Sequence, residues 1–555
     1  MNKKVCSFPI LFALLALLIG TCAVVFPASA QAAPTSTGSI TVSGTVASSY
    51  DAYQIFSANV VDGDSDAKIA TDLAWASDAA RDAVLPVLHS AGMSNSQTTA
   101  QEAAEWLNTD SHLTSALSAQ LARSLQSSGA VSVALNAGMA AELPCGYWLI
   151  VADDDAIAQG EAGTAPIMAL VGGGAVTVKP KAATPKVAKH VLEDGTAAWQ
   201  KAADATVADD LYWRLSATVP AGLTAYDTYA VQFVDTMSAG LDPSKVAASM
   251  RVYVAAGADG GFDAVSAGKD GRAGTDPAKG WTDITAQCAT KVAADGTFTV
   301  RTGDLIAALG GADAFTAGAR VVAVYNAPLN SACSHGIAKG NPNEVYLRYP
   351  RSPFADQSGD AGFTRTPSDD ACAYAWDLAL TKRGSDGDKP LAGAVLSIAD
   401  DRGRTLAADG TWDAEGKATV TTGEDGRVTV SGVDSGKLEV RELKAPKGYT
   451  AFEGTRSVTV KAEGLDVDQV AAAKPKLTIT AESPLRADSA DGSTGSLEAS
   501  LINTPTGTPP SITTGGFMPS TGDMAMYAAA AAAVAGAALI VVALLVKRGG
   551  GSHKE

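Results

Sequence analysis

The chain has 555 residues and a formal net charge of −17 at pH 7, and 46% of its residues are hydrophobic while only 6% are aromatic. This length suffices for three or four domains, and the acidic balance argues against nucleic acid as a partner. Gly, Ala, Thr and Val are abundant, and turn-forming Asp-Gly pairs recur along the chain. Such a composition is typical of β-sandwich domains with many tight turns.

The N-terminus has the pattern of a secretory signal peptide. The basic pair Lys3-Lys4 precedes an apolar stretch from Ile10 to Phe26, and the small residues Ala28-Ser29-Ala30 follow. This order predicts cleavage after Ala30, which removes residues 1–30. An uncleaved anchor is the alternative, and the Ala-Ser-Ala site disfavours it.

Four cysteines remain in the mature chain, namely Cys145, Cys288, Cys333 and Cys372. Four cysteines allow three pairings, and Cys288 with Cys333 is the candidate disulfide because both fall in one predicted domain. No CxxC pair or histidine-rich cluster indicates a metal site, so we expect no metal and no cofactor. No histidine stands in an HExxH or nucleophile-elbow context, which leaves an enzymatic function poorly supported.

The first region, residues 31–181, combines strand patterns with helical ones. Strands are predicted at 38–44, 53–56, 147–151 and 175–178. Between them lie Ala-rich segments compatible with helices, at 72–91 and 98–127. In the second segment leucines recur every fourth residue from Leu113 to Leu125, which indicates a helical face packed into a core. A partner-binding helix is the alternative interpretation.

The second region, residues 182–372, and the third, residues 373–506, contain short strands separated by Gly, Asp and Asn turns. This pattern favours a β-sandwich in each. In the second region the strands are predicted at 211–215, 229–234, 251–254, 298–300, 320–325 and 345–349. In the third they are predicted at 377–380, 394–398, 427–430, 438–441, 457–460 and 497–502. Residues 507–517 are rich in Thr, Pro and Gly and form an extended linker.

The C-terminal segment, residues 518–555, begins with Met518-Pro519-Ser520-Thr521-Gly522 and continues with an apolar run at 527–546 and the basic pair Lys547-Arg548. At about 1.5 Å per residue the run makes roughly 30 Å of helix, enough to cross a bilayer. The basic pair would hold the C-terminus in the cytoplasm, so the preceding chain would lie outside.

This order resembles the LPXTG sorting signal of Gram-positive surface proteins, with Met518 in place of Leu. The resemblance implies that a sortase cleaves between Thr521 and Gly522 and passes the Thr521 carbonyl to an amine. A permanent single-span anchor is the alternative.

The third region carries further motifs of such proteins: Leu380-Thr-Lys382, Leu391-Ala-Gly-Ala394, Thr422-Gly-Glu-Asp-Gly426, Glu442-Leu-Lys-Ala-Pro-Lys-Gly-Tyr449 and Ile502-Asn-Thr-Pro505. Together they resemble the Cna B-type domain of Gram-positive adhesins and pilins. The resemblance implies an isopeptide bond between Lys382 on the first strand and Asn503 on the last, promoted by Glu442. Burial suits this chemistry, because it lowers the pKa of an amine and raises that of a carboxyl group.

The second region resembles the fimbrial isopeptide-formation domain of Gram-positive shaft pilins. The matching pieces are Pro185-Lys-Val-Ala-Lys189-His-Val191, a Pro-x-x-Leu-x-x-Tyr stretch after Val219, Val234-Asp235-Thr-Met-Ser-Ala-Gly240-Leu241 and Asn341-Pro-Asn343-Glu-Val-Tyr-Leu347. By position, the resemblance makes Lys189 the amine, Asp235 the buried acid and Asn343 the carboxamide, with Asn341 as a competing acceptor. Both internal bonds are expected to tie the first strand of a domain to its last. Two turn residues and a surface lysine are the alternative, since Asp and Asn favour turns.

The first region offers no comparable pair. Between Gln31 and Val178 the only lysine is Lys68, which lies beyond the first strand, so we expect no Lys–Asn crosslink there. The stretch Val176-Thr-Val178-Lys179-Pro180-Lys181 resembles the Val-x-Val-Tyr-Pro-Lys motif of shaft pilins, whose lysine accepts the sortase-bound carbonyl. Lys181 is the match, although Lys179 stands where the aromatic residue belongs. Lys179 and Lys186 are the other candidate acceptors, and an ordinary linker lysine is the remaining alternative.

These patterns predict a mainly β protein with three tandem immunoglobulin-like or Cna B-type sandwiches, helical insertions in the first, and a transmembrane helix in the precursor. The resemblances imply a fimbrial shaft subunit on the surface of a Gram-positive bacterium, attached covalently to the cell wall. Its partners would be pilin-type and housekeeping sortases, other pilin subunits, peptidoglycan and an unidentified host receptor. A wall-anchored adhesin or minor pilin that is not polymerised is the alternative.

Overall fold

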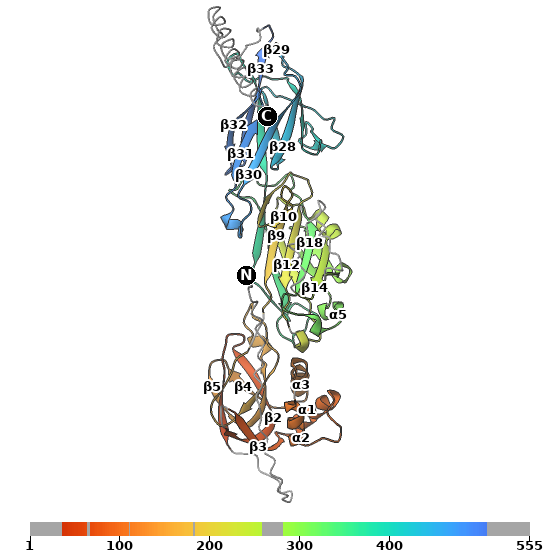
Figure 1. Ribbon diagram of the computed structural model, residues 1–555, viewed down its shortest axis with the longest axis vertical. Coiled ribbons are helices and arrows are strands. Elements are labelled where there is room, and N and C mark those ends of the chain that lie inside the picture. The colour runs from red at the N-terminus through yellow and green to blue at the C-terminus, as the bar shows by residue number, and fades with distance from the viewer. Residues whose placement is uncertain are drawn as a thin grey trace, which may run out of the picture.

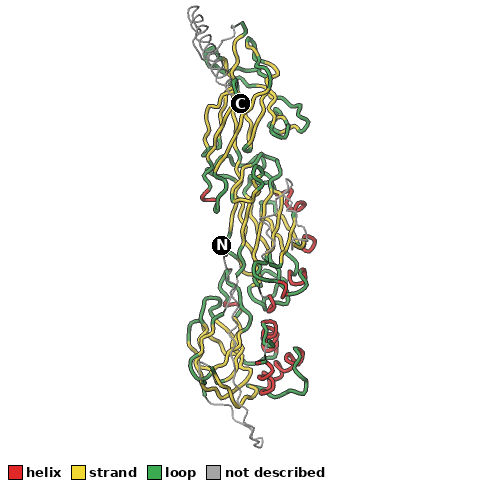
Figure 2. The backbone as a smooth tube through the Cα atoms, viewed as in Figure 1, coloured by secondary structure: helices red, strands yellow, loops and turns green. Residues whose placement is uncertain are grey.

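The structure is a computed structural model that describes residues 36–63, 67–109, 111–180, 184–221, 223–257 and 281–507. Its strands group into three successive pairs of sheets, here called the first, second and third units, which follow one another along the long axis of the molecule (Figure 1). Helices gather beside the sheets of the first unit, and shorter ones lie along one side of the second (Figure 2). The predicted mainly β fold with helical insertions in the first region is confirmed.

Both predicted terminal segments lie outside the described residues. These are the signal peptide at 1–30 and the sorting signal at 518–555 with its span at 527–546. Within the described part of the chain, no helix combines the length and apolar character needed to cross a bilayer.

The first unit contains a sheet of order β5-β1-β8 and a second sheet of order β3-β2-β6-β7, in which β4 also pairs with β2. The strands are β1 (Thr37–Val42), β2 (Ser49–Asp62), β3 (Lys68–Trp75), β4 (Ser132–Asn136), β5 (Ala140–Pro144), β6 (Gly146–Ala152), β7 (Ile167–Val171) and β8 (Val176–Val178). Alternate residues of β1 face inwards, so that Ile40 and Val42 are buried, as the period of a strand requires.

Three helices pack beside the second sheet of this unit: α1 (Asp78–Ser90), α2 (Ala100–Asn108) and α3 (Ser115–Ser127), with a 3₁₀ turn η2 (Asp154–Ala156) further along the chain. The helix expected at 72–91 begins only at residue 78, because residues 68–75 pair with β2 as strand β3. The prediction was wrong there because cross-strand pairing overrides the helical propensity of this Ala-rich sequence.

The helix expected at 98–127 is two helices, each with its own N-cap. The Thr99 side chain accepts a hydrogen bond at the start of α2, and Thr114 does the same at the start of α3. Leu117, Leu121 and Leu125 are buried in the core, as predicted from their spacing. Leu113 precedes α3 and is 40% exposed, so it does not belong to the stripe.

The second unit is a sandwich of two six-membered strand paths, β10-β9-β12-β18-β14-β15 and β11-β21-β19-β13-β17-β16, with β20 added beside β19. Its strands are β9 (Val187–Glu193), β10 (Ala198–Gln200), β11 (Ala202–Asp204), β12 (Tyr212–Thr218), β13 (Gln232–Met237), β14 (Arg251–Ala255), β15 (Trp281–Asp283), β16 (Ala289–Val292), β17 (Thr297–Arg301), β18 (Arg320–Asn326), β19 (Asn341–Pro350), β20 (Phe363–Arg365) and β21 (Asp369–Tyr374). Short helical turns connect them: η3 (Leu223–Ala225), η4 (Pro243–Lys245), α4 (Val246–Ser249), η7 (Thr285–Gln287), α5 (Leu305–Ala308) and η8 (Ala312–Ala314).

The third unit pairs a sheet of order β27-β22-β33-β29, in which β32 also joins β33, with a sheet of order β25-β24-β23-β28-β30-β31, in which β26 joins β23. Its elements are β22 (Trp376–Gly384), β23 (Val395–Ala399), β24 (Thr405–Leu406), β25 (Trp412–Asp413), β26 (Val420–Thr421), β27 (Arg427–Val433), β28 (Gly436–Lys444), β29 (Tyr449–Thr450), β30 (Thr455–Glu463), η9 (Val470–Ala472), β31 (Lys476–Ala481), β32 (Leu485–Asp491) and β33 (Ser496–Pro505). Its first and last strands, β22 and β33, lie side by side and run parallel.

All four described cysteines are free thiols, so the predicted Cys288–Cys333 disulfide is wrong for this structure. Cys288 follows the turn η7, where its thiol donates to the Ile284 carbonyl oxygen at 3.3 Å. Cys333 packs against the core of the second unit, and its side chain interacts with His335 instead. Membership of one sandwich therefore did not bring the two thiols together.

The first and second units are joined by direct contacts. Arg123 on α3 donates to the Ala225 carbonyl oxygen at 3.1 Å and pairs with Asp227 at 3.2 Å. The Gly163 N–H donates to the Arg351 carbonyl oxygen at 2.7 Å, and a Cβ at position 163 would come within 2.8 Å of the Ser352 Cβ. The glycine thus permits the close approach of the two backbones.

The second and third units are joined more tightly, because a single residue, Ala375, separates strand β21 from strand β22. The domain boundary predicted after residue 372 falls inside β21. Gly336 of the second unit and Gly495 of the third both have positive φ, of 76° and 75°. A Cβ on Gly336 would lie 2.5 Å from the Gly495 nitrogen, so this contact between units requires glycine.

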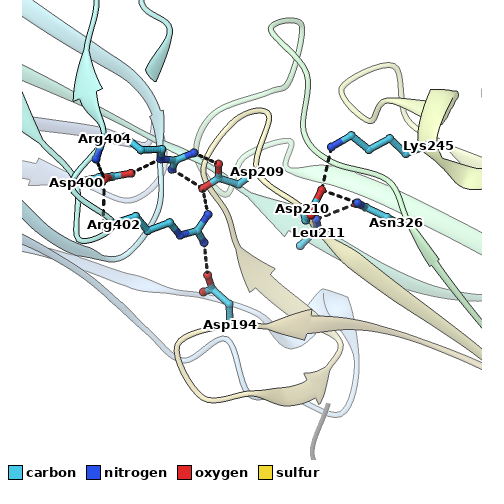
Figure 3. Close-up of polar contacts among 9 residues, drawn as sticks. All are labelled: Asp194, Asp209, Asp210, Leu211, Lys245, Asn326, Asp400, Arg402 and Arg404. Atoms are coloured by element: carbon cyan, nitrogen blue, oxygen red, sulfur yellow. Dashed lines mark hydrogen bonds and ion pairs between the residues drawn. The ribbon is translucent and has the colours of Figure 1, made fainter. Parts of the chain in front are cut away.

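An ion-pair network reinforces this second joint (Figure 3). Asp209 of the second unit accepts hydrogen bonds from both terminal nitrogens of Arg404 and from Arg402 Nη1, the last at 2.8 Å. Arg402 reaches Asp194 at 3.4 Å, and the Arg404 Nε donates to Asp400 at 2.7 Å. The bidentate arrangement holds the loop between β23 and β24 against the second unit.

Replacing Arg404 with alanine should therefore destabilise the joint. Because Asp209 is only 10% exposed and would lose its bidentate partner, we expect the free energy of unfolding to fall by about 1–3 kcal/mol. Urea unfolding of the ectodomain measures the change. Arg486→Ala is the matched control, since its pair with Asp488 is more exposed and should contribute less than about 1 kcal/mol. Equal losses in the two variants would contradict the assignment.

Candidate functional site

The third unit brings Lys382, Glu442 and Asn503 together in its core. Lys382 lies on β22 and Asn503 on the adjacent strand β33, in a register that places Gly384 opposite Asn503. Glu442 projects from β28 in the facing sheet. Lys382 is fully buried and Asn503 is 2% exposed. Strand alternation explains the lysine, which occupies the same inward face as Leu378 and Leu380.

One carboxylate oxygen of Glu442 faces both nitrogens of this cluster. Its Oε1 lies 3.7 Å from the Lys382 Nζ and accepts from the Asn503 Nδ2 at 2.9 Å. The other oxygen, Oε2, accepts from the Phe452 backbone N–H at 3.0 Å, which fixes the orientation of the carboxylate. The Lys382 Nζ also donates to the Leu501 carbonyl oxygen at 3.2 Å. Glu442 is thus placed to carry a proton from one nitrogen to the other.

Burial lowers the pKa of Lys382 to about 8, although the nearby Glu442 charge opposes the shift. Burial therefore increases the neutral fraction of the amine relative to an exposed lysine, and only the neutral amine is a nucleophile. The Asn503 Oδ1 is buried and has no hydrogen-bond partner among the described residues.

The second unit brings together Lys189, Asp235 and Asn343, all fully buried. Lys189 lies on β9 in one sheet, whereas Asp235 on β13 and Asn343 on β19 belong to the facing sheet. Strands β20 and β21 follow β19, so the expectation that both crosslinks tie a first strand to a last strand is wrong for this unit. The cluster spans the two sheets instead.

A fourth residue, Tyr325, completes this cluster, and the sequence reasoning missed it. The Lys189 Nζ contacts the Asp235 Oδ2 and donates to the Tyr325 hydroxyl at 2.9 Å. The Tyr325 hydroxyl donates to the Asp235 Oδ2 at 3.1 Å and accepts from the Asn343 Nδ2 at 2.9 Å. The available signal was the alternation of the strand at 320–325, which places Tyr325 on the face of Val321 and Ala323.

The two charged partners of this cluster have shifted pKa values. Burial lowers the pKa of Lys189 to about 8, with the charge of Asp235 acting in the opposite direction. Burial raises the pKa of Asp235, against the effect of Lys189. Both shifts favour the neutral forms of the pair, an amine and a carboxylic acid.

The competing acceptor Asn341 is committed elsewhere. Its Nδ2 donates to the carbonyl oxygens of Ser334 and Ala373 at 2.9 and 3.1 Å, and its Oδ1 accepts from the Ser334 N–H at 2.8 Å. Lys68 of the first unit is likewise separate, since its Nζ pairs with Asp62 and donates to backbone oxygens near Gly172.

The candidate acceptor lysines lie between the first and second units. Lys179 and Lys186 are exposed. Lys181 lies outside the described residues, as do all five residues of the sorting motif, Met518, Pro519, Ser520, Thr521 and Gly522.

Part of the chain matches a known family model. The model is that of the SpaA prealbumin-like fold domain, and the match covers residues 377–474. These residues of the third unit are therefore similar to a SpaA prealbumin-like fold domain. Lys382 and Glu442 lie inside the matched stretch, whereas Asn503 lies beyond it.

A curated relative is the trypsin-resistant surface T6 protein of Streptococcus pyogenes serotype M6, 29% identical over 143 residues. These are 24% of this chain and 24% of that protein, so the chain aligns with about a quarter of the relative. Similar solved structures include the T6 backbone pilin of the same serotype, with 17% identity, a TM-score of 0.45 and coverage of 85% of this chain and 98% of that one. The full-length major pilin SpaD of Corynebacterium diphtheriae has 14% identity and a TM-score of 0.42, with the same two coverages.

The lowered pKa of Lys382 predicts a pH effect in a third-unit variant that keeps the free amine, Asn503→Ala. Between about pH 8 and the ordinary lysine pKa of 10.5, the unfolded chain holds a proton that the folded chain has released. The free energy of unfolding should therefore rise with pH across this window, by on the order of 3 kcal/mol. Denaturant unfolding at a series of pH values measures the rise.

The matched control is Asn503→Ala combined with Lys382→Met, which lacks the titrating amine. Its stability should not show this rise. Equal slopes in the two variants would mean that Lys382 titrates normally in the folded protein.

Proposed function

We propose that this chain is the structural subunit of a covalently polymerised surface fimbria of a Gram-positive bacterium. The observation that carries the proposal is the repeated burial of a lysine beside an acid and an asparagine, once in each of two successive sandwiches. A buried lysine ammonium is costly even beside one carboxylate, and a cluster that converts the lysine into an amide removes that cost. The name of the curated relative, a trypsin-resistant surface protein, is consistent with such a role.

In the third unit the neutral Lys382 Nζ would attack the Asn503 Cγ. A new Nζ–Cγ bond forms, the Cγ–Nδ2 bond breaks, and Glu442 carries a proton from Nζ to Nδ2, which leaves as ammonia. The contact of Glu442 Oε1 with both nitrogens supports this path. Folding supplies the alignment, so each chain reacts once and no turnover enzyme is needed.

In the second unit Lys189 and Asn343 would form the equivalent bond, with Asp235 as the acid. This bond would join the two facing sheets. The third-unit bond would instead join the neighbouring strands β22 and β33. By analogy with a disulfide, closing the loop from 382 to 503 stabilises the folded state by on the order of 4 to 5 kcal/mol, and reductants cannot open it.

Polymerisation would use the two segments outside the described residues. A pilin-type sortase would cleave between Thr521 and Gly522 and join the Thr521 carbonyl to Lys181 of another subunit, and a housekeeping sortase would attach the finished polymer to peptidoglycan. The exposure of the neighbouring Lys179 and Lys186 supports an accessible connection at this place. The proposed organisation also includes the signal peptide, three domains at 31–181, 182–372 and 373–506, and the linker at 507–517. The role of the chain would be structural rather than enzymatic.

Intact mass spectrometry of the secreted ectodomain tests the internal bonds. The wild-type chain should weigh less than its sequence mass by two ammonia molecules, because each condensation releases one. Lys189→Ala and Lys382→Ala should each restore one. Lys68→Ala is the matched control, since the Lys68 side chain is also largely buried but pairs with Asp62 in the first unit, outside both clusters. A wild-type mass equal to the sequence mass would refute both bonds.

Denaturing gels of wall extracts test the acceptor. Lys181→Ala in the native host should abolish the ladder of high-molecular-weight polymers, because no amine then receives the Thr521 carbonyl. Lys179→Ala and Lys186→Ala are the controls and should keep the ladder. A ladder that survives Lys181→Ala would contradict this assignment, and its absence from the wild type would favour a wall-anchored adhesin or minor pilin.

A further inference from the structure

The two buried clusters differ in how the acid reaches the asparagine. In the third unit Glu442 accepts directly from the Asn503 Nδ2, at 2.9 and 3.1 Å for its two oxygens. In the second unit the acid is an aspartate, which is shorter by one methylene. Among the hydrogen bonds of the described residues, Asp235 is connected to Asn343 only through the Tyr325 hydroxyl.

The Tyr325 hydroxyl uses its full hydrogen-bonding capacity inside this cluster. It donates to the Asp235 Oδ2 and accepts from the Lys189 Nζ and the Asn343 Nδ2. A phenol has one donor and two acceptor sites, so each is occupied by one member of the cluster. Among the described residues of the second unit, no other group hydrogen-bonds both the attacking nitrogen, Lys189 Nζ, and the leaving nitrogen, Asn343 Nδ2.

The ring of Tyr325 is held in place by its surroundings. It packs edge-on against Phe298, with ring centroids 4.7 Å apart, and its backbone lies opposite Trp213 across the β12–β18 pairing. The Lys189 Nζ lies 5.5 Å from the centroids of both the Tyr325 and Trp213 rings. The hydroxyl is therefore presented at a fixed position in a core that excludes water.

We propose that Tyr325 is a catalytic residue of the second-unit crosslink and relays the proton from Asp235 to the leaving nitrogen of Asn343. This inference rests on the proposed Lys189–Asn343 bond. The Asp235–Tyr325 pair would thus transfer the proton that Glu442 transfers alone in the proposed reaction of the third unit.

The neutral Lys189 Nζ bonds to the Asn343 Cγ. Asp235, which starts as the neutral carboxylic acid, passes its proton to the Tyr325 oxygen while the phenolic proton turns to the Nδ2. The resulting Asp235 carboxylate takes the surplus proton from the Nζ. The Cγ–Nδ2 bond breaks and ammonia leaves, so Asp235 and Tyr325 end in their starting protonation states. Burial raises the pKa of Tyr325 well above its usual value, which keeps the phenol protonated before the reaction.

The test uses the secreted ectodomain carrying Tyr325→Phe, with intact mass and peptide mapping as readouts. The variant should lose one ammonia molecule instead of two, with the remaining crosslink at Lys382–Asn503, which shows that the third unit has folded. Tyr349→Phe is the matched control, because Tyr349 is also buried and its hydroxyl donates to the Gly160 carbonyl oxygen away from the cluster. This control should lose two.

A second measurement keeps the proposal testable if Tyr325→Phe does not fold. Cell-free synthesis with 3-fluorotyrosine at position 325 retains the ring and the hydroxyl but makes the phenol more acidic. Samples quenched at intervals should show a changed rate of ammonia loss at the second site and an unchanged rate at the third. An unchanged second-site rate, or two ammonia molecules lost at the normal rate from Tyr325→Phe, would overturn the role of Tyr325 but not the proposed Lys189–Asn343 bond. A wild-type chain without the Lys189–Asn343 bond would overturn the underlying function as well.

Discussion

The burial of a lysine amine beside a carboxyl group is the interaction on which the organisation of this protein depends. An ammonium group loses its hydration inside a sandwich, and the attraction of one carboxylate only partly offsets that loss. In both clusters the lowered pKa of the lysine records this imbalance. The cores must therefore be closed and well packed around the lysines before the amines become reactive, which ties the chemistry to completed folding.

The two clusters bring a lysine, an acid and an asparagine together through different topologies. In the third unit the amine and the carboxamide come from parallel neighbours in one sheet, and the acid comes from the opposite sheet. In the second unit the amine lies on one sheet, and the acid and the carboxamide lie on the other. A covalent bond would lock two strands of a sheet in the first arrangement and the two layers of the sandwich in the second. In the second unit the Tyr325 hydroxyl connects the shorter Asp235 to Asn343. In the third unit Glu442 contacts Asn503 directly.

The joints between units extend this rigidity along the molecule. One residue links β21 to β22, and the Arg402–Arg404 loop is held by Asp209 across the joint. Among its described residues the first unit has no buried lysine cluster, and it contacts the second unit through Arg123 and the Gly163–Arg351 hydrogen bond. The long axis therefore runs through two units with internal lysine clusters and one held by ordinary core packing and hydrogen bonds.

The sequence by itself determined the features that depend on local pattern. The motifs of the third region, through their resemblance to the Cna B-type domain, indicated Lys382, Glu442 and Asn503, and the composition indicated β-sandwiches. Local pattern did not separate strand β3 from the helix after it, because strand pairing with β2 overrides the propensity of an Ala-rich segment. Only the tertiary structure decided that β20 and β21 follow the strand of Asn343, that Cys288 and Cys333 lie apart, and that Tyr325 enters the second cluster. The physical reason is that these three facts depend on which strands face one another across a core, and the period of a strand fixes the face of a residue but not its partner on the other sheet.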